Sequence, residues 1–132
     1  MTYTTTPQPA PKKNKTLKVL LLVLLALALL AAAGLYYVKS ASDKIDHDRA
    51  KEACIEDVTD YAKYPGGRSF PDGDPSPVTE DGWLDNPRTY TAEGAVDFVN
   101  GFGAPVRYSY SCTADITSAG EVARSLARVE KR

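Results

Sequence analysis

The chain has 132 residues, of which 43% are hydrophobic and 25% are charged. One uncharged run, Val19–Val38, occupies part of this length. The residues that remain are too few for a two-domain enzyme and suffice for one small domain with a modest core. The charges are unevenly distributed: residues 1–38 contain four lysines and no acid, whereas residues 39–132 contain twelve basic and seventeen acidic residues, a net of −5. An acidic segment repels phosphates, so nucleic acid is not expected as a partner.

Residues 1–16 are predicted to be a disordered cytoplasmic N-terminus. They are rich in threonine and proline and poor in apolar side chains, so they cannot bury enough surface to offset the entropy lost on ordering. Four lysines precede the apolar run: Lys12, Lys13, Lys15 and Lys18. The positive-inside rule places such a cluster in the cytoplasm.

Residues 17–38 are predicted to form a transmembrane helix, because about 20 helical residues cross a hydrocarbon core of about 30 Å. Tyr36 and Tyr37 fall near one end, where aromatic rings prefer the headgroup layer. A cleaved signal peptide is the alternative, since Ala31–Ala33 offers small residues of the kind a signal peptidase accepts. The long apolar run and the long leader favour an uncleaved anchor. We therefore predict a single-pass plasma-membrane protein with residues 39–132 outside.

An amphipathic helix is predicted next, with Ser42 as its N-cap and Asp43 in its first turn. Its core-facing stripe is expected to contain Ile45, Cys54, Ile55, Val58, Tyr61 and Ala62. Its polar surface is expected to contain Asp46, Asp48, Arg49, Glu52, Glu56 and Lys63. The segment 64–67 ends it through a proline and two glycines. Whether this helix continues from the membrane span is left open.

Residues 65–87 contain five prolines and four glycines and are predicted to be a loop, with short strands near residues 68–70 and near Val78. Phe70 and Trp83 are interpreted as apolar plugs at the edge of the core.

A β-hairpin is predicted from alternating apolar residues in 90–98 and again in 106–114, joined by Asn100–Gly103. The face expected to be buried contains Tyr90, Ala92, Gly94, Val96, Phe98, Val106, Tyr108, Tyr110, Cys112 and Ala114. The last segment, 121–132, fits either a helix or a further strand, and we favour the strand. The expected fold is α+β: the transmembrane helix, then one amphipathic helix packed on an antiparallel sheet of about three to four strands.

The two cysteines fall on the faces predicted to meet, Cys54 on the helix stripe and Cys112 on the second hairpin strand. A disulfide is expected between them, because disulfides persist outside the cytoplasm. In the chain-entropy model such a bridge contributes about 4 kcal/mol. Two buried free thiols are the alternative, which would suit a cytoplasmic domain.

No catalytic, cofactor-binding or metal-binding residue is predicted, and an enzyme is not expected. His47 with Asp43 supplies too few ligands for zinc. Five acidic residues of the loop were considered for calcium: Asp72, Asp74, Glu80, Asp81 and Asp85. They do not fit the EF-hand pattern, which would place glycine at Pro77 and glutamate at Trp83.

Three short motifs carry a family resemblance: Cys54 with Val58, the hairpin segments 94–97 and 100–107, and Tyr110–Thr113. Together they resemble a family of small bacterial membrane-anchored exported domains of actinobacterial or phage-like type. The resemblance covers about residues 50–115. It implies an exported domain behind a membrane segment, and many members have no assigned function. The family carries no catalytic signature, so no functional residue is carried over.

These observations predict a non-enzymatic single-pass membrane protein that presents an extracytoplasmic interaction domain, as an accessory subunit of a larger membrane or cell-envelope complex. A small-ligand-binding or sensing module is one alternative, and a phage-type superinfection-exclusion protein is another. The expected partners are the lipid bilayer and other membrane or envelope proteins, without a cofactor. The oligomeric state is left open.

Overall fold

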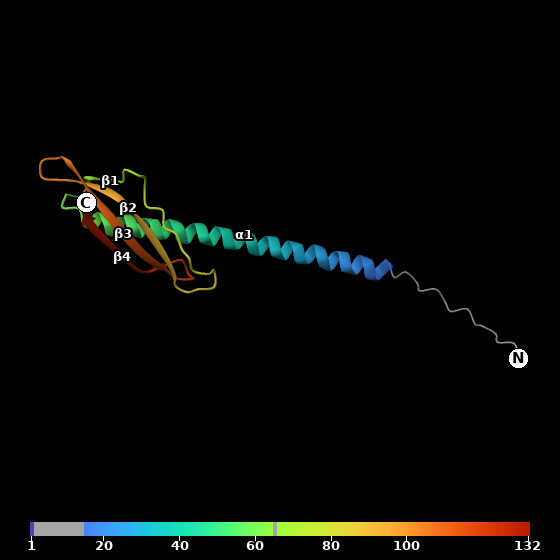
Figure 1. The fold of residues 1–132 in the computed structure, drawn as a ribbon. Coiled ribbons are helices and arrows are strands. Elements are labelled where there is room, and N and C mark those ends of the chain that lie inside the picture. The colour runs from blue at the N-terminus through green and yellow to red at the C-terminus, as the bar shows by residue number, and fades with distance from the viewer. Residues whose placement is uncertain (2–14, 65) are drawn as a thin grey trace. The chain divides into compact units, whose positions relative to one another are not determined.

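The computed structural model describes Met1 and residues 15–64 and 66–132 (Figure 1). It contains one helix, α1 (Lys15–Asp60), and four strands: β1 (Arg68–Ser69), β2 (Arg88–Val99), β3 (Pro105–Ile116) and β4 (Val122–Lys131). The chain divides into two units, Met1–Val38 and Lys39–Arg132. Most of the segment predicted to be disordered, residues 2–14, lies outside the described residues.

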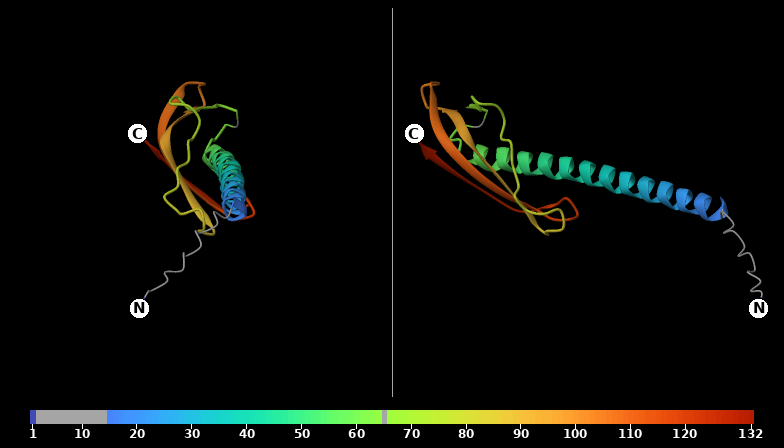
Figure 2. Two further views of the ribbon diagram at one scale, coloured as in Figure 1. Left: turned by 90° about the vertical axis from the view of Figure 1, so that its right-hand side faces the viewer. Right: turned by 45° about the vertical axis from the view of Figure 1, so that its right-hand side comes forward.

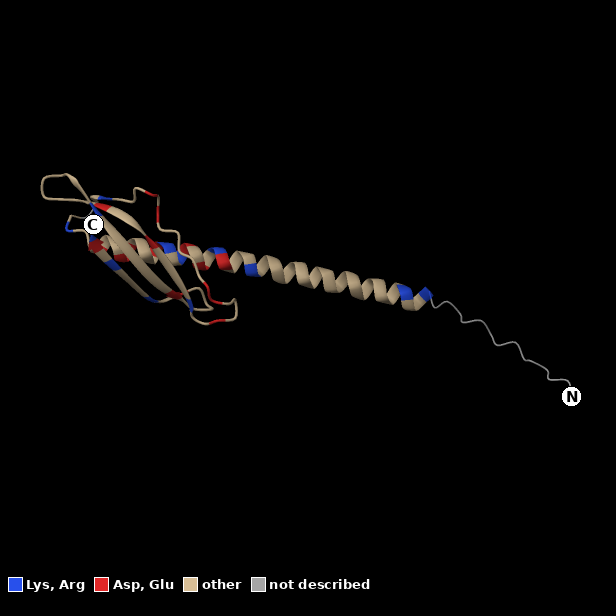
Figure 3. Cartoon of the chain, in the orientation of Figure 1, with Lys and Arg blue, Asp and Glu red and all other residues tan. Residues whose placement is uncertain are grey.

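The first unit is the apolar half of α1. It carries no charged side chain between Lys18 and Lys39 (Figure 3), and every side chain from Lys15 to Val38 is exposed. By length and composition α1 is able to cross a membrane. The core helix of a soluble protein would be largely buried, whereas this segment exposes a continuous leucine-rich surface of the kind that marks a membrane or protein contact.

The predicted helix start at Ser42 is wrong, because α1 runs through this position without interruption. An N-cap satisfies backbone N–H groups that have no carbonyl one turn earlier, and in a continuous helix the preceding turn already supplies those carbonyls. The helix also ends earlier than predicted, at Asp60. Its last turn tightens through bonds to the third residue back, from Tyr61 N–H to the Val58 carbonyl at 3.3 Å and from Ala62 N–H to the Thr59 carbonyl at 2.8 Å.

The strands of the second unit form a four-stranded antiparallel sheet in the order β1-β2-β3-β4 (Figures 1 and 2). The predicted hairpin is confirmed as β2 and β3, paired from Arg88 opposite Ile116 to Val99 opposite Pro105. The last segment is a strand, β4, as favoured from the sequence. Val78 makes an isolated bridge to Thr91 of β2. The α+β class and the strand number therefore agree with the sequence prediction.

Alternate residues of β2 and β3 form the buried face of the sheet, as predicted. Its buried members are Tyr90, Ala92, Val96, Phe98, Tyr110, Cys112, Ala114 and Ile116. Gly94 leaves room on this face for a large neighbour, because a Cβ there would lie 2.8 Å from the Tyr110 hydroxyl oxygen. From β4, Ala127 completes the buried set.

The helix buries every fourth residue against this core: Asp46, Ala50, Cys54 and Val58. Ile45 was predicted to share the stripe and does not, since it is 53% exposed. Nine residues separate Ile45 from Cys54, which at 3.6 residues per turn places the two about 180° apart around the helix axis. Asp46 was assigned to the polar surface, and this was also wrong.

The loop before β2 contains one apolar plug instead of the predicted two. Phe70 is half-buried and packs edge-on against Tyr110, with ring centroids 5.8 Å apart. Trp83 is 63% exposed. The side chains that the loop does bury fully are Pro75 and Pro77.

Cys54 and Cys112 form a disulfide that joins α1 to β3, with the two Cα atoms 5.7 Å apart. Both residues are buried in one cluster with Val58, Val96 and Phe98. The predicted pairing is present, and it closes a loop across 58 positions of the sequence.

The register of β3 predicts unequal effects of a new charge on its two faces. Tyr110→Asp places a carboxylate in the buried face and should lower the free energy of unfolding by several kcal/mol. Ser111→Asp adds the same charge on the exposed face, between Glu93 and Arg128, and should change it by less than about 1 kcal/mol. Urea unfolding of the full chain in detergent measures both, and equal losses would contradict the register.

The disulfide predicts a stability that depends on redox state. Reduction should lower the free energy of unfolding by about 4 kcal/mol. Cys54→Ser should do at least as much harm, because it leaves a hydroxyl in an apolar cluster. Thermal unfolding with and without reductant measures the effect, and the Cys54→Ser variant, which should not respond to reductant, is the control. If the melting temperature of the unaltered chain is the same with and without reductant, the bond has no structural role.

Candidate functional site

The most buried polar arrangement in the described residues is an ion-pair cluster of Arg88, Asp43 and Asp46, here called the Arg88 cluster. Arg88 opens β2 and reaches across to α1. Its Nη1 donates to Asp43 Oδ1 at 2.7 Å, and its Nη2 donates to Asp46 Oδ2. The side chains of Arg88 and Asp46 are only 12% and 8% exposed, while that of Asp43 is 43% exposed.

The chain around Asp46 explains why this carboxylate needs a cation. Gly120, in the turn between β3 and β4, lies over it, and a Cβ there would be 3.5 Å from Asp46 Oδ1. A carboxylate withdrawn from water is strongly destabilising unless it is paired, and Arg88 supplies the pair. The hydrogen bond to Asp43 is the largest influence that raises the pKa of Arg88, so the guanidinium stays charged.

Tyr90 extends the cluster along β2. The Arg88 guanidinium carbon lies 5.9 Å from the centroid of the Tyr90 ring, within cation–π range. Burial raises the pKa of Tyr90, although the nearby Arg88 opposes the shift. The phenol is therefore a neutral, ordered wall beside the ion pair.

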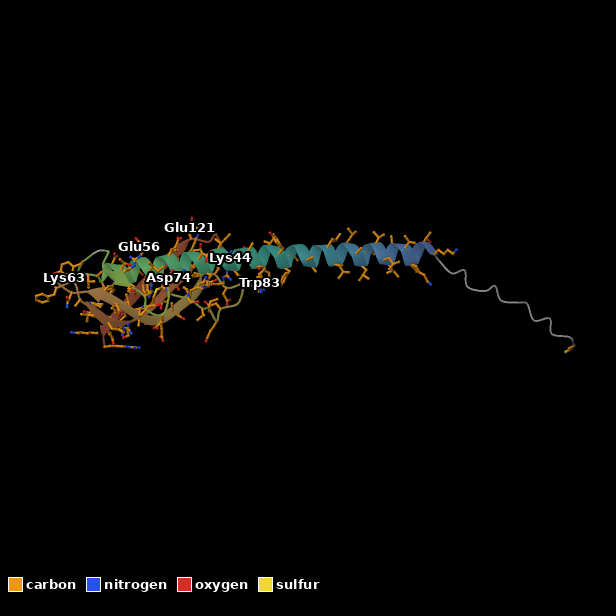
Figure 4. The ribbon with its side chains drawn as sticks, turned by 90° about the horizontal axis from the view of Figure 1, so that it is seen from above. Lys44, Glu56, Lys63, Asp74, Trp83 and Glu121 are labelled. Atoms are coloured by element: carbon orange, nitrogen blue, oxygen red, sulfur yellow. A yellow bond between two sulfur atoms is a disulfide. The ribbon has the colours of Figure 1, made fainter. Side chains whose placement is uncertain are left out.

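A cavity of about 360 Å³ adjoins the Arg88 cluster and is called the Trp83 cavity. It is lined by Lys39, Asp43 and His47 of α1, by Pro77, Val78, Thr79, Asp81 and Trp83 of the loop, and by Arg88 and Tyr90 of β2. Its wall therefore combines an aromatic surface with both signs of charge. Figure 4 shows Trp83 at the same end of this unit as Lys44 and away from Lys63.

A second cavity of about 320 Å³, the Tyr64 cavity, lies where α1 ends. It is lined by Tyr61, Lys63, Tyr64, Phe98, Val99, Asn100, Gly101, Val106, Tyr108 and Val129. The Phe98 and Tyr108 rings pack 5.4 Å apart, and the Tyr61 hydroxyl donates to the Ala127 carbonyl at 2.8 Å. This wall is largely aromatic and apolar, so it suits an apolar or aromatic group.

Three of the five acidic residues named as calcium candidates have separate partners. Asp74 pairs with Lys51 at 3.0 Å, Asp81 accepts a hydrogen bond from Thr89 N–H at 2.6 Å, and Asp85 accepts one from Gly82 N–H at 2.6 Å. Within the ranges that the structure describes, no three His, Cys, Asp or Glu side chains gather closely enough to hold a metal ion.

His47 lies on the wall of the Trp83 cavity. Its Nδ1 is 3.7 Å from Asp48 Oδ1, so its nearest acidic partner is not the Asp43 considered from the sequence.

Sequence reasoning missed the Arg88 cluster. Asp46 occupies the same four-residue series as Ala50, Cys54 and Val58, and that spacing was the available signal. Because Asp46 is charged, it was expected to be exposed. Nothing in the local pattern around Arg88 points to a partner 42 positions away.

Comparison with family models, curated proteins and solved structures finds no match to this chain. The family resemblance of residues 50–115 therefore stays a prediction.

The Arg88 cluster predicts a large asymmetry between two arginine substitutions. Arg88→Gln leaves the buried Asp46 without its cation and should lower the free energy of unfolding by about 3 kcal/mol or more. Arg107→Gln breaks the exposed pair with Asp97, at 2.8 Å, and should have a much smaller effect. Urea unfolding of both variants measures the difference. A loss at Arg88 no larger than that at Arg107 would show that Asp46 is solvated.

Proposed function

We propose that this chain is a single-pass membrane protein whose N-terminus is cytoplasmic and whose domain, residues 39–132, is held outside as a binding module. The observation that carries the proposal is the combination of two features in α1. Its first half exposes an uninterrupted apolar surface, and its second half carries a buried disulfide to β3. The first needs a bilayer, and the second needs an oxidising compartment.

Binding is favoured over catalysis by how the described polar residues are used. The buried Arg88 and Asp46 pair with each other in the Arg88 cluster, and two acidic side chains of the loop accept hydrogen bonds from backbone N–H groups. Aromatic side chains, in contrast, are left available at both ends of the domain: Trp83 is 63% exposed and Phe102 is 98% exposed. Exposed aromatic residues are the usual anchors of protein interfaces.

Phe102 sits on a turn that is rigidly built. The Asn100 side-chain oxygen accepts hydrogen bonds from Phe102 N–H and Ala104 N–H, both at 3.0 Å. The Asn100 backbone also bonds to Ala104 and to Gly103, which has a φ of 78°. Ordering a turn so well while leaving its phenylalanine in water gives no folding advantage. We therefore propose this turn as the contact to a larger membrane or envelope complex in which the protein is an accessory subunit.

A second candidate function is the binding of a small extracytoplasmic ligand. The observation that favours it is the Trp83 cavity, whose volume of about 360 Å³ lies at the lower end of the range of small-molecule sites. The presence of Lys39, Asp43 and Arg88 on its wall suits a polar ligand with an aromatic or apolar part.

Topology fusions test the placement. A reporter that is active only outside the cytoplasm, fused after Arg132, should be active, and a cytoplasmic reporter at the same position should be silent. The reverse pattern would overturn the placement. N-terminal sequencing of the mature protein should read the first residues of the chain, whereas a start near Gly34 would retain the placement and remove the anchor.

Affinity purification from native membranes in mild detergent tests the subunit proposal. Phe102→Ala should abolish the co-purification of partner proteins and leave the free energy of unfolding within about 0.5 kcal/mol, because the side chain contacts solvent. Leu126→Ala, which removes another exposed apolar side chain, is the matched control and should retain the partners. Undiminished capture by the Phe102 variant would contradict a role for the turn.

A further inference from the structure

The loop before β2 exposes a second apolar surface at the end of the domain where the chain leaves its apolar run. Trp83 is 63% exposed and its neighbour Leu84 is 77% exposed. Val78, which pairs with Thr91, is 63% exposed. Three large apolar side chains so close in one loop form a patch that water solvates poorly.

Hydrogen bonds hold the turn in this arrangement. The Asp85 carboxylate accepts from Gly82 N–H at 2.6 Å, and the Gly82 carbonyl accepts from Asp85 N–H at 3.0 Å. The Asp81 carboxylate ties the same turn to β2 through Thr89 N–H at 2.6 Å. These carboxylates are engaged with the backbone, so they fix the turn and leave Trp83 and Leu84 pointing outward.

The position of the turn follows from the Trp83 cavity. Trp83 lines this cavity together with Lys39, which directly follows Val38, the last residue of the apolar run. The turn therefore shares this cavity with the residue at which the chain would leave the bilayer, at the Lys44 end of the domain (Figure 4).

We infer that residues 81–85 form a second membrane contact, in which Trp83 and Leu84 enter the headgroup layer. The inference rests on the proposed function, since it requires residues 17–38 to be in a bilayer. The partner is the lipid interface. Tryptophan prefers this layer because its ring is apolar while its N–H donates to polar groups, and the exposed Lys39 and Lys44 face the same layer with charges that match lipid phosphates.

This second contact would restrain the exported domain. A single helix lets a domain rotate and tilt, whereas a turn seated in the interface fixes one side toward the membrane. The Trp83 cavity would then open at the lipid surface. The Phe102 turn adjoins the Tyr64 cavity, where α1 ends, and would remain in the aqueous phase for a partner.

Trp83 is the single tryptophan of the chain, so fluorescence excited at wavelengths that tyrosine does not absorb reports on this turn alone. The full chain would be reconstituted into phosphatidylcholine vesicles in which the lipid is either unbrominated, brominated near the headgroup, or brominated near the end of the acyl chains. The inference expects a blue-shifted emission and about twofold quenching by the shallow bromines, with weaker quenching by the deep ones. A water-like emission that neither lipid quenches would overturn it.

The control moves the tryptophan to the other turn. In the variant that combines Trp83→Phe with Phe102→Trp, the reporter replaces a side chain that is 98% exposed, and its emission should be water-like and insensitive to bromine. Quenching of both reporters to the same extent would overturn the inference, because it would show general adsorption to lipid.

Flotation of the same vesicles after alkaline carbonate extraction separates the two proposals. Chain that floats while Trp83 stays unquenched overturns the interfacial turn and supports the anchor. Chain that does not float overturns the anchor, and the interfacial turn with it. Chain that floats with Trp83 quenched selectively by shallow bromines supports both.

Discussion

The disulfide between Cys54 and Cys112 is the constraint on which the rest of the domain depends. The core around it is small, and alanine supplies four of its twelve clustered buried residues: Ala92 and Ala127 in the same cluster, and Ala50 and Ala114 in the next. Alanine buries little apolar area, so this core contributes less than one rich in leucine and phenylalanine. A covalent bond worth about 4 kcal/mol is then a large part of the 5–15 kcal/mol that ordinary domains have. Because disulfides persist in oxidising compartments, the stability of the domain bears directly on its proposed location.

The Arg88 cluster supplies the second attachment of α1 to the sheet. Asp46 and Cys54 are eight residues apart on one helix face, and each is joined to a different strand, β2 and β3. Two such attachments fix the rotation of the helix as well as its distance from the sheet. With the helix fixed, the two exposed aromatic turns are held at defined positions, one beside Lys39 and one beside the end of α1. The packing of this one helix on the sheet therefore gives the domain two chemically different ends.

The sequence predicted the parts of the fold that local periodicity determines, and it failed where a distant residue decides the outcome. The period of two in 90–98 and 106–114 identifies the hairpin and its buried face, and the position of Cys112 on that face pointed to Cys54. Ser42 looked like a helix cap because cap signals are local, while the continuity of α1 depends on the preceding turn. Asp46 and Arg88 each look like surface residues until the fold brings them together. Trp83 was interpreted as an apolar plug at the edge of the core, yet two neighbouring carboxylates accept hydrogen bonds from the backbone and hold the turn with Trp83 exposed.

The central claim is that an anchored chain carries its folded domain in an oxidising compartment. The most direct measurement is to alkylate thiols in intact cells, extract the protein from the membrane without reductant, digest it and identify the peptides by mass spectrometry. The account predicts one peptide pair joined through Cys54 and Cys112, no alkylated cysteine, and an N-terminal peptide that begins before the apolar run. Two alkylated cysteines in the membrane-extracted protein would contradict it, because they would place a reduced domain in the cytoplasm.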